Sequence, residues 1–317
     1  MDVLDLSAIK DCLDERRVLA AIEKNFIAYS NGQSNVPPVG HLVLPGGDTH
    51  IKYGHIEGDV HFIIKVASGF HDNMQKGLNA STGLMLLCSA DTGQPLALLV
   101  DEGHLTDVRT ALAGAVAGKY LSIKSANAVG VVGTGVQAEL QLRAICDVSG
   151  YRKALVWGRD PARAENLCER FSHTDIAVSA VPVLEDLVTQ TRHIVTTTPA
   201  TSPIIQSEWV QPGTHITAVG ADCPGKQELA TDLVSRADVL VVDSVSQCVD
   251  QGEIQTALAA GEIAVSDLIE LGHVIDGSAA GRSDDEQITI ADLTGVAVQD
   301  IAIANSVYQV WRNSQSN

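Results

Sequence analysis

A short apolar run followed at once by a glycine-rich turn constrains this chain more than any other stretch of its sequence. Residues 128–132, AVGVV, have the unbroken apolar character of a buried parallel strand. The turn that follows reads Gly133-Thr134-Gly135-Val136-Gln137-Ala138, and apolar residues then recur at helical spacing. In a dinucleotide-binding βαβ unit, the first glycine permits the tight turn, the second lets the backbone approach the pyrophosphate, and a small third residue lets helix pack on strand. The sequence therefore predicts that these six residues bind a dinucleotide.

The order of strand and helix patterns divides the chain into two domains of an α/β protein. Over residues 119–287, apolar runs alternate with helical patterns, as a doubly wound Rossmann parallel sheet requires. The predicted strands of this domain are residues 128–132, 154–157, 193–197, 215–219 and 238–243. Over residues 1–118, turn signals separate shorter runs, which predicts a mainly antiparallel sheet with strands at 42–44, 49–53, 60–66, 84–87 and 96–100. We expect residues 288–317, with a helix at 298–311, to return to this first domain.

Helical patterns flank the antiparallel sheet. Residues 3–30 are predicted to be mainly helical, with a cap near Asp5, and residues 105–121 to form a helix capped by Thr106. The polar tail at 313–317 is expected to be disordered.

Composition excludes several classes of partner. The formal net charge is −18, from 39 acidic and 21 basic residues, which argues against binding to a nucleic-acid backbone or an anionic membrane. No run of 18 apolar residues is present, and the N-terminus lacks the basic and apolar regions of a secretory signal. The six cysteines are scattered without metal-ligand spacing and fit a reducing compartment, so we expect a cytoplasmic protein without a metal.

The end of the second Rossmann strand bears on the choice of cofactor. NAD selectivity usually rests on an acidic residue at this position, but here Gly158 and Arg159 follow the strand, and Arg163 comes one turn later. A guanidinium suits the 2′-phosphate of NADP, whereas Asp160 could still reach a ribose hydroxyl. We therefore favour NADP slightly and retain NAD. Further cofactor contacts are expected from residues at the carboxyl ends of later strands, namely Thr197, Thr198, Val219 and Gly220.

Three charged residues are candidates for the chemistry. Lys65 lies within an apolar strand, where a lysine is costly unless it is paired or faces a cleft; the alternative is a strand face open to water. Arg109 lies one turn into a predicted helix and is either a ligand for an anion or a helix-surface charge. Asp222 follows a Rossmann strand at the ligand-binding rim and is either functional or a turn residue.

Several short motifs occur together along the chain. They are the strand lysine Lys65, Thr82-Gly83, Asp91-Thr92-Gly93-Gln94-Pro95-Leu96-Ala97, Leu105-Thr106-Asp107-Val108-Arg109-Thr110-Ala111, the Gly133–Ala138 turn, Gly220-Ala221-Asp222-Cys223-Pro224-Gly225-Lys226-Gln227-Glu228-Leu229, and Thr294-Gly295. With these motifs over most of its length, the chain resembles the ornithine cyclodeaminase/mu-crystallin family, which includes archaeal alanine dehydrogenase and several imino-acid reductases.

The resemblance implies roles for individual residues. It implies that Lys65 and Arg109 hold the substrate carboxylate, that Lys65 also transfers protons, and that Asp222 contacts the substrate nitrogen. It places Thr82, and with it Arg109 and Thr294-Gly295, near the cofactor. It also implies a homodimer formed through the sheet domain.

Two departures from the family pattern affect the substrate. The family commonly carries an arginine after the early prolines, but here the sequence is Pro37-Pro38-Val39, and we hypothesise that Lys52 supplies the missing charge. The cyclodeaminases carry a glutamate near the position of Leu42, which is not acidic here. A distal ammonium would need such a partner, so ornithine is disfavoured; His50, Lys52 and His61 would instead suit a second carboxylate.

We therefore expect an NAD(P)-dependent oxidoreductase that interconverts a 2-imino acid and a 2-amino acid by hydride transfer at the α-carbon. One alternative is an ornithine cyclodeaminase-type lyase that releases ammonia and uses NAD catalytically. Another is a mu-crystallin-like protein that binds NADPH and a small ligand without turnover.

Overall fold

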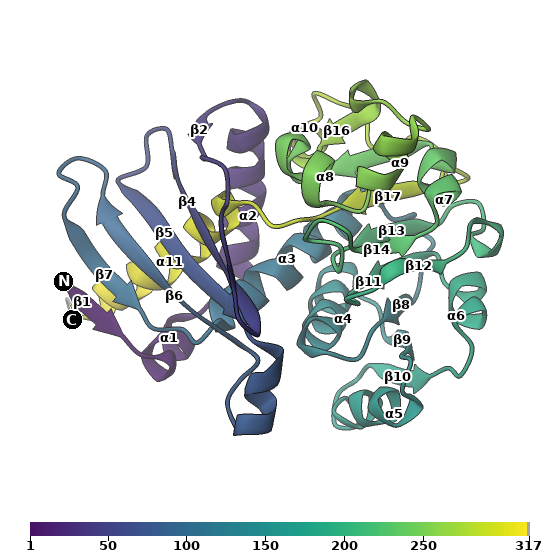
Figure 1. Ribbon diagram of the computed structural model, residues 1–317, viewed down its shortest axis with the longest axis horizontal. Coiled ribbons are helices and arrows are strands. Elements are labelled where there is room, and N and C mark those ends of the chain that lie inside the picture. The colour runs from purple at the N-terminus through teal and green to yellow at the C-terminus, as the bar shows by residue number, and fades with distance from the viewer. Residues whose placement is uncertain (316–317) are drawn as a thin grey trace. The chain divides into compact units, whose positions relative to one another are not determined.

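The computed structural model describes residues 1–315, together with all of their side chains except those at positions 71 and 74. The chain forms two compact units, one built from Met1–Thr110 with Val296–Asn317 and the other from Ala111–Gly295 (Figure 1). Each of these junctions lies eight residues from the predicted one, at 110 against 118 and at 296 against 288. The later return has a physical reason, because residues 289–292 pair within the parallel sheet of the second unit.

The first unit is a seven-stranded sheet, antiparallel except for the pairing of β1 with β7. Its strand order is β1-β7-β6-β5-β4-β2, and β3 also pairs with β4. The strands are β1 (Asp2–Leu4), β2 (Ser34–Asn35), β3 (Gly40–Leu44), β4 (Gly47–Ile56), β5 (His61–Gly69), β6 (Ser81–Ser89) and β7 (Pro95–Leu99). The helices are α1 (Leu6–Cys12), α2 (Glu15–Ser30), the 3₁₀ helix η1 (His71–Lys76) and α11 (Ala297–Ser314).

Helix α11 joins the two chain ends into one core. It packs against α1, α2 and strands β4, β5 and β6, and crosses the sheet in Figure 1. The strands alternate accordingly: Ile63 and Lys65 on β5 are buried, whereas Ile64 and Val66 between them are partly exposed. The predicted alternation of the Lys65 strand is thus confirmed.

The second unit is an all-parallel, Rossmann-like sheet with the order β10-β9-β8-β11-β13-β17-β15-β16. Its strands are β8 (Val129–Val132), β9 (Lys153–Trp157), β10 (Ala177–Ala180), β11 (His193–Thr196), β13 (His215–Ala218), β15 (Val239–Val242), β16 (Leu268–Glu270) and β17 (Thr289–Asp292), and β12 (Thr201–Ile205) pairs with β14 (Gln227–Leu229) separately. The remaining elements are α4 (Val136–Ser149), α5 (Pro161–Glu169), α6 (Leu184–Gln190), α7 (Thr231–Arg236), α8 (Val245–Gln251), α9 (Gln255–Ala260), α10 (Leu271–Asp276), η2 (Ser207–Trp209) and η3 (Val265–Asp267), while α3 (His104–Leu121) spans the first junction.

The predicted α/β fold class is confirmed, with both sheets as expected. The five predicted Rossmann strands correspond to β8, β9, β11, β13 and β15. The edge strands β10 and β16 were not predicted, because they are short and lack a fully buried apolar run. The chain leaves β8 for β9 and β10 and then returns to the other side of β8 with β11. In such sheets ligands bind at this reversal point, outside the carboxyl ends of the strands.

Local details differ from the prediction at both ends of the first unit. The segment 3–30 begins with strand β1, followed by α1, which Asp5 caps by accepting a hydrogen bond from Ala8 N at 2.9 Å. Helix α3 begins at His104, and the side chain of Asp101, not that of Thr106, accepts from Leu105 N at 2.8 Å. The last helix continues to Ser314, so the first residues of the expected disordered tail are helical; positions 316 and 317 lie outside the described residues.

Among the described helices, none has the length and apolar character needed to cross a bilayer.

Candidate functional site

The first glycine of the fingerprint turn has a conformation and a position that only glycine tolerates. Gly133 has φ of +129°, and a Cβ atom there would lie 2.3 Å from Oγ1 of Thr197 at the end of β11. Its N–H donates to the carbonyl of Trp157 at 2.8 Å. The turn is therefore fixed at the reversal point between β8 and β11, where sheets of this kind bind their ligands.

The start of α4 fits a pyrophosphate group. Gly135 is the N-cap residue and has no side chain to cap the helix, and a Cβ atom on Gly135 would meet nothing within 4 Å. Ala138 is fully buried, so its small side chain allows α4 to pack closely on the sheet. Open space at a helix N-terminus, where the backbone N–H groups point outward, is what an anionic phosphate requires. These residues fit a bound dinucleotide.

The end of β9 presents two arginines and a capping aspartate. A Cβ atom on Gly158 would lie 2.4 Å from Cγ2 of Thr134, so this position also requires a small residue. Asp160 caps α5 by accepting from Ala162 N at 3.1 Å. Arg159 and Arg163 are exposed, and no ion pair involving either is found within residues 1–315. Two cations without carboxylate partners thus lie where the ribose-selecting residue was predicted.

A buried glutamate that the sequence analysis missed holds the rim of the sheet together. The carboxylate of Glu228 accepts four hydrogen bonds: from Thr196 Oγ1 at 2.7 Å, Thr198 N at 2.6 Å, Thr198 Oγ1 at 2.7 Å and Gly220 N at 2.9 Å. Burial raises the pKa of Glu228, although the hydrogen bonds oppose the change. Glu228 therefore joins the loops after β11 and β13, which carry the predicted cofactor residues Thr197, Thr198, Val219 and Gly220. The signal that could have identified it is an acidic residue between Gln227 and the apolar Leu229-Ala230.

The other predicted residues of this unit have different surroundings. The Asp222 side chain is 49% exposed, and its carboxylate lies 2.5 Å from Lys226 Nζ. Thr294 Oγ1 and Gly295 N donate to the buried Asp243 at 3.0 and 2.6 Å. Asp222 is thus an accessible residue of the rim, whereas the buried carboxylate of Asp243 holds Thr294-Gly295 in place.

In the first unit, Lys65 and Arg109 share one buried carboxylate. Lys65 Nζ lies 3.0 Å from each oxygen of Asp300, and Arg109 Nε lies 3.0 Å from Oδ1 of the same residue. Nη1 of Arg109 also donates to Gln299 Oε1 at 2.6 Å. The exposed fractions of Lys65, Arg109 and Asp300 are 2%, 5% and 1%. Lys65 therefore does not face water, and Arg109 is not a charge on the helix surface. Asp300 and Gln299 were missed, although two polar residues within the apolar run of α11 were a signal.

Three basic residues gather at this cluster. Lys52 is the register partner of Lys65 across β4 and β5, and its charge acts on both Lys65 and Asp300. The buried Asp101 also acts on Lys65. Basic side chains gathered in this way favour the binding of an anion.

Burial lowers the pKa of Lys65 to about 7, with help from the nearby charge of Arg109 and against the opposing effect of Asp300. A lysine with such a pKa exchanges a proton readily near neutrality, which suits a general acid or base.

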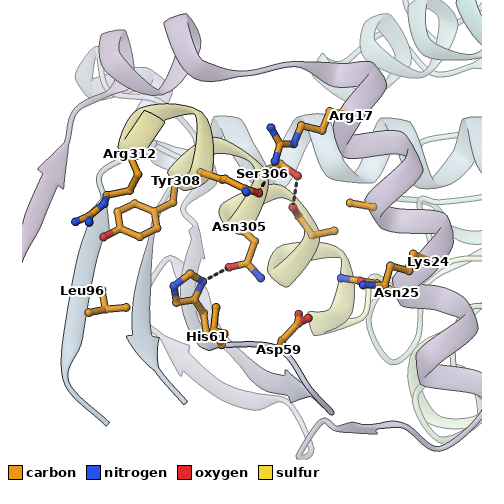
Figure 2. A pocket seen from close by; sticks show the side chains of 14 residues that line it. Arg17, Lys24, Asn25, Asp59, His61, Leu96, Asn305, Ser306, Tyr308 and Arg312 are labelled. Atoms are coloured by element: carbon orange, nitrogen blue, oxygen red, sulfur yellow. Dashed lines mark hydrogen bonds between the residues drawn. The ribbon is translucent and has the colours of Figure 1, made fainter. Parts of the chain in front are cut away.

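Two other predicted residues of this unit lie apart from the cluster. Thr82 is exposed on β6, opposite Ser68, where its backbone packs near Gly103. His61 lies at the far end of β5 and faces a pocket of about 600 Å³ between α2 and α11 (Figure 2). Its Nδ1 lies 2.9 Å from Asn305 Oδ1. None of Lys52, Lys65 and Arg109 lines this pocket, so His61 is separated from the cationic cluster.

Sequence and structure comparisons place the chain in a family. The sequence matches the model of the ornithine cyclodeaminase/mu-crystallin family over residues 2–315. This chain belongs to that family. Among curated ornithine cyclodeaminase/mu-crystallin proteins, it is 43% identical over 310 residues to the uncharacterized cyclodeaminase y4tK of Sinorhizobium fredii, covering 96% of this chain and 91% of that protein. It is 35% identical over 308 residues to the alanine dehydrogenase of Archaeoglobus fulgidus, covering 97% and 94%.

Solved structures of the family share the complete fold. An archaeal alanine dehydrogenase dimer with bound NAD superimposes with a TM-score of 0.93 at 34% identity, covering 99% of this chain and 97% of that one. The iminosuccinate reductase of Paracoccus denitrificans, in complex with NAD⁺, superimposes with a TM-score of 0.92 at 32% identity, covering 99% and 97%. Ornithine cyclodeaminase/mu-crystallin proteins similar to this chain thus include dehydrogenases, imine reductases and cyclodeaminases.

Proposed function

We propose that this protein is an NAD(P)-dependent oxidoreductase that interconverts a 2-imino acid and a 2-amino acid. The observation that carries the proposal is the buried Lys65–Asp300–Arg109 cluster, in a chain that also has the glycine turn typical of dinucleotide-binding proteins. In this proposal, the unit Ala111–Gly295 binds the cofactor, and the sheet unit binds the substrate carboxylate. The dehydrogenase and reductase relatives support it.

The residues divide the chemistry among them. The bound cofactor supplies or accepts the hydride at the α-carbon. Arg109 and Lys52 neutralise the substrate carboxylate. Asp300 and Gln299 orient Arg109. Lys65 gives one proton to the imine nitrogen before hydride transfer, and Asp222 attracts the iminium so formed. In the oxidation direction Lys65 takes one proton back from the iminium. An imine, one proton and one hydride thus balance one amine.

Lys52 provides a test of the carboxylate assignment. Replacing Lys52 by alanine should raise the substrate KM about 10-fold or more, because a hydrogen bond to a charged group is lost, while the NADH dissociation constant stays unchanged. Steady-state kinetics and NADH fluorescence titration measure the two quantities. An unchanged substrate KM would remove Lys52 from the site.

The proposed cofactor is NAD(H) or NADP(H), with NADP(H) slightly favoured. Arg159 and Arg163 support a 2′-phosphate, and Asp160 is engaged as a helix cap. The similar structures with NAD or NAD⁺ support the alternative. The dissociation constants of NADH and NADPH, measured for wild type and for Arg159→Ala, decide between the two cofactors. If NADP(H) is the cofactor, the variant should bind NADPH more weakly and NADH as before.

A cyclodeaminase is the second candidate, favoured by the 43% identity to y4tK. A 340 nm assay with imines separates it from a reductase, because a cyclodeaminase shows no net change in cofactor. L-ornithine with NAD and ammonia detection runs in parallel. Sustained NAD(P)H oxidation with an imine supports our proposal, ammonia release without it supports the lyase, and cofactor binding with neither signal supports a ligand-binding protein.

A further inference from the structure

The pocket between α2 and α11 is separate from the cationic cluster and carries charged side chains of its own (Figure 2). Its volume of about 600 Å³ is typical of sites that bind small molecules. His61, which lines the pocket, and Lys65 lie on the same face of β5, four positions or about 13 Å apart at 3.3 Å per residue. A small ligand of this pocket therefore occupies a site of its own.

Helix α2 contributes two basic side chains to the pocket. Arg17, Lys24 and the buried Asn25 lie on one face of this helix, at positions i, i+7 and i+8. Arg17 donates to the side chain of Gln309, an uncharged partner on α11, and Asn25 donates to the carbonyl of Val298 at 2.9 Å. No ion pair of Arg17 or Lys24 is found in the described part of the chain. Both charges are therefore available to an anionic group.

One carboxylate lines the same pocket. Asp59 lies in the turn between β4 and β5, and Figure 2 shows it across the pocket from Arg17. It is partly buried, and within residues 1–315 no hydrogen bond or ion pair of its carboxylate is found. Acidic and basic groups thus line one pocket without neutralising each other. A ligand that carries both signs of charge would pair with all of them.

The wall opposite α2 is held in a fixed position and is partly apolar. His61 Nδ1 lies 2.9 Å from Asn305 Oδ1, and the His61 ring contacts the ring of Tyr308 edge-on, with centroids 5.7 Å apart. Tyr308 is itself buried. The apolar residues of the lining include Ala21, Leu96 and Ala302. These surfaces suit an apolar group of a ligand.

We propose that this pocket binds a free α-amino acid with an apolar side chain, in its zwitterionic form. Arg17 and Lys24 are two helical turns apart, about 10.5 Å along the axis, and their long side chains reach one carboxylate from either side. Asp59 binds the ammonium group, and the side chain of the ligand packs on the apolar lining. A simple anion would leave Asp59 without a partner, and a simple cation would leave the two basic residues without one. This second site is independent of the reaction proposed above.

The test follows Leu96 by NMR, because the proposed active site at Lys65 also takes amino acids and a signal from the pocket itself is needed. The full-length protein is labelled with ¹³C in its leucine methyl groups, and the Leu96 signals are those missing from Leu96→Ile. It is titrated with L-leucine, with the 2-oxo acid 4-methyl-2-oxopentanoate, and with the amine 3-methylbutylamine. L-Leucine should shift the Leu96 signals saturably and bind about 10-fold or more tightly than either analogue, because each analogue lacks one hydrogen-bonded charged group.

Two variants separate the two ends of the ligand. Asp59→Asn should weaken the binding of L-leucine about 10-fold and remove its advantage over the 2-oxo acid, which has no ammonium group. Lys24→Ala should weaken L-leucine and the 2-oxo acid alike and remove the advantage of L-leucine over the amine. A merely structural role of either residue would change the affinities of all three ligands equally.

Lys10→Ala and Asp11→Asn are the matched controls, because they remove one charge of each sign from exposed positions of α1 that do not line the pocket. They should leave all three affinities unchanged. The proposed site is ruled out if L-leucine does not shift the Leu96 signals, or if it binds no more tightly than its analogues. It is also ruled out if Lys24→Ala and Asp59→Asn bind L-leucine like wild type, since the Leu96 shift would then report binding elsewhere.

Discussion

Asp300 is the residue on which the cationic cluster depends. One carboxylate, fully enclosed by α11 and the sheet, compensates both Lys65 and Arg109 at 3.0 Å. Removing one member of a buried ion pair costs far more than removing an exposed one, since the remaining charge stays buried without compensation. The stability of the first unit and the anion binding that we propose for it therefore depend on the same side chain.

Replacing Asp300 by alanine should reduce the free energy of unfolding by about 3–5 kcal/mol. Asp175→Ala is the control, because it breaks an exposed pair with Arg152, in which Asp175 is 74% exposed, and should cost less than about 1 kcal/mol. Urea denaturation followed by circular dichroism measures both. Equal losses in the two variants would show that the buried pair is not special.

The pKa of Lys65, about 7 because of burial and the neighbouring cations, predicts opposite pH dependences for the two reaction directions. In the proposed mechanism, reduction of the imine needs protonated Lys65, so kcat/KM should fall as the pH rises through about 7. Oxidation of the amino acid needs the neutral amine and should rise over the same interval. Lys65→Arg should lose this inflection, because arginine stays protonated at neutral pH. An unchanged inflection near pH 7 in that variant would assign proton transfer to another group.

At the scale of elements, a chain of buried carboxyl groups connects the loops of the parallel sheet. Glu253 accepts from Glu228 N and Leu229 N at 2.6–3.0 Å, and Asp292 accepts from Ile254 N at 3.2 Å. Burial raises the pKa values of Glu253 and Asp292 to about 8, and their neighbouring acidic groups add to the effect. The loops that carry Thr198 and Gly220 thus rest on groups that hold protons in the folded state at neutral pH.

This arrangement predicts that stability declines with rising pH. A carboxyl group whose folded pKa is raised stabilises the protein fully below its unfolded pKa, near 4.5 for glutamate, and that stabilisation is lost as pH rises to about 8. The melting temperature should therefore fall between pH 5 and 8, and Glu253→Gln should flatten the decline. The exposed Glu262→Gln should leave it unchanged. A variant curve parallel to that of wild type would show that Glu253 does not titrate in this range.

At the scale of the whole molecule, exposed apolar side chains gather on the unit through which the homodimer is expected to form. Nine of the twelve large exposed apolar residues found in the described chain belong to Met1–Thr110. Contiguous exposed apolar residues mark interaction surfaces, whereas scattered ones do not, and Leu42, Val43 and Leu44 are consecutive exposed residues of β3. The similar archaeal alanine dehydrogenase is a dimer, which supports the expected homodimer.

Sedimentation equilibrium should therefore give a mass near 66.8 kDa, which is twice 33.4 kDa. Val60 is 71% exposed in the sheet unit, and Val60→Glu should shift the mass toward the monomer because a charge would be buried at the interface. Val265→Glu, at a 52% exposed position of the other unit, should remain dimeric. A monomeric wild type would contradict the assignment.

The sequence by itself determined the features that depend on neighbouring residues. The Gly133–Ala138 turn, the five central strands of the parallel sheet and the strand position of Lys65 follow from backbone sterics and from short-range apolar patterns, which act over a few residues. The two-sheet architecture followed because the pattern changes along the chain from short alternating runs to alternating strands and helices.

Only the tertiary structure decided which polar groups become partners. Asp300 is 235 residues from Lys65, Glu228 is 30 residues from Thr198, and Asp101 replaced Thr106 as the helix cap. His41 stacks on His50 because β3 and β4 bring the two into register, and His61, which the sequence grouped with His50, lies at the other end of the face. A buried charge must find its counter-charge wherever packing brings one close, and that distance in space is independent of separation along the chain.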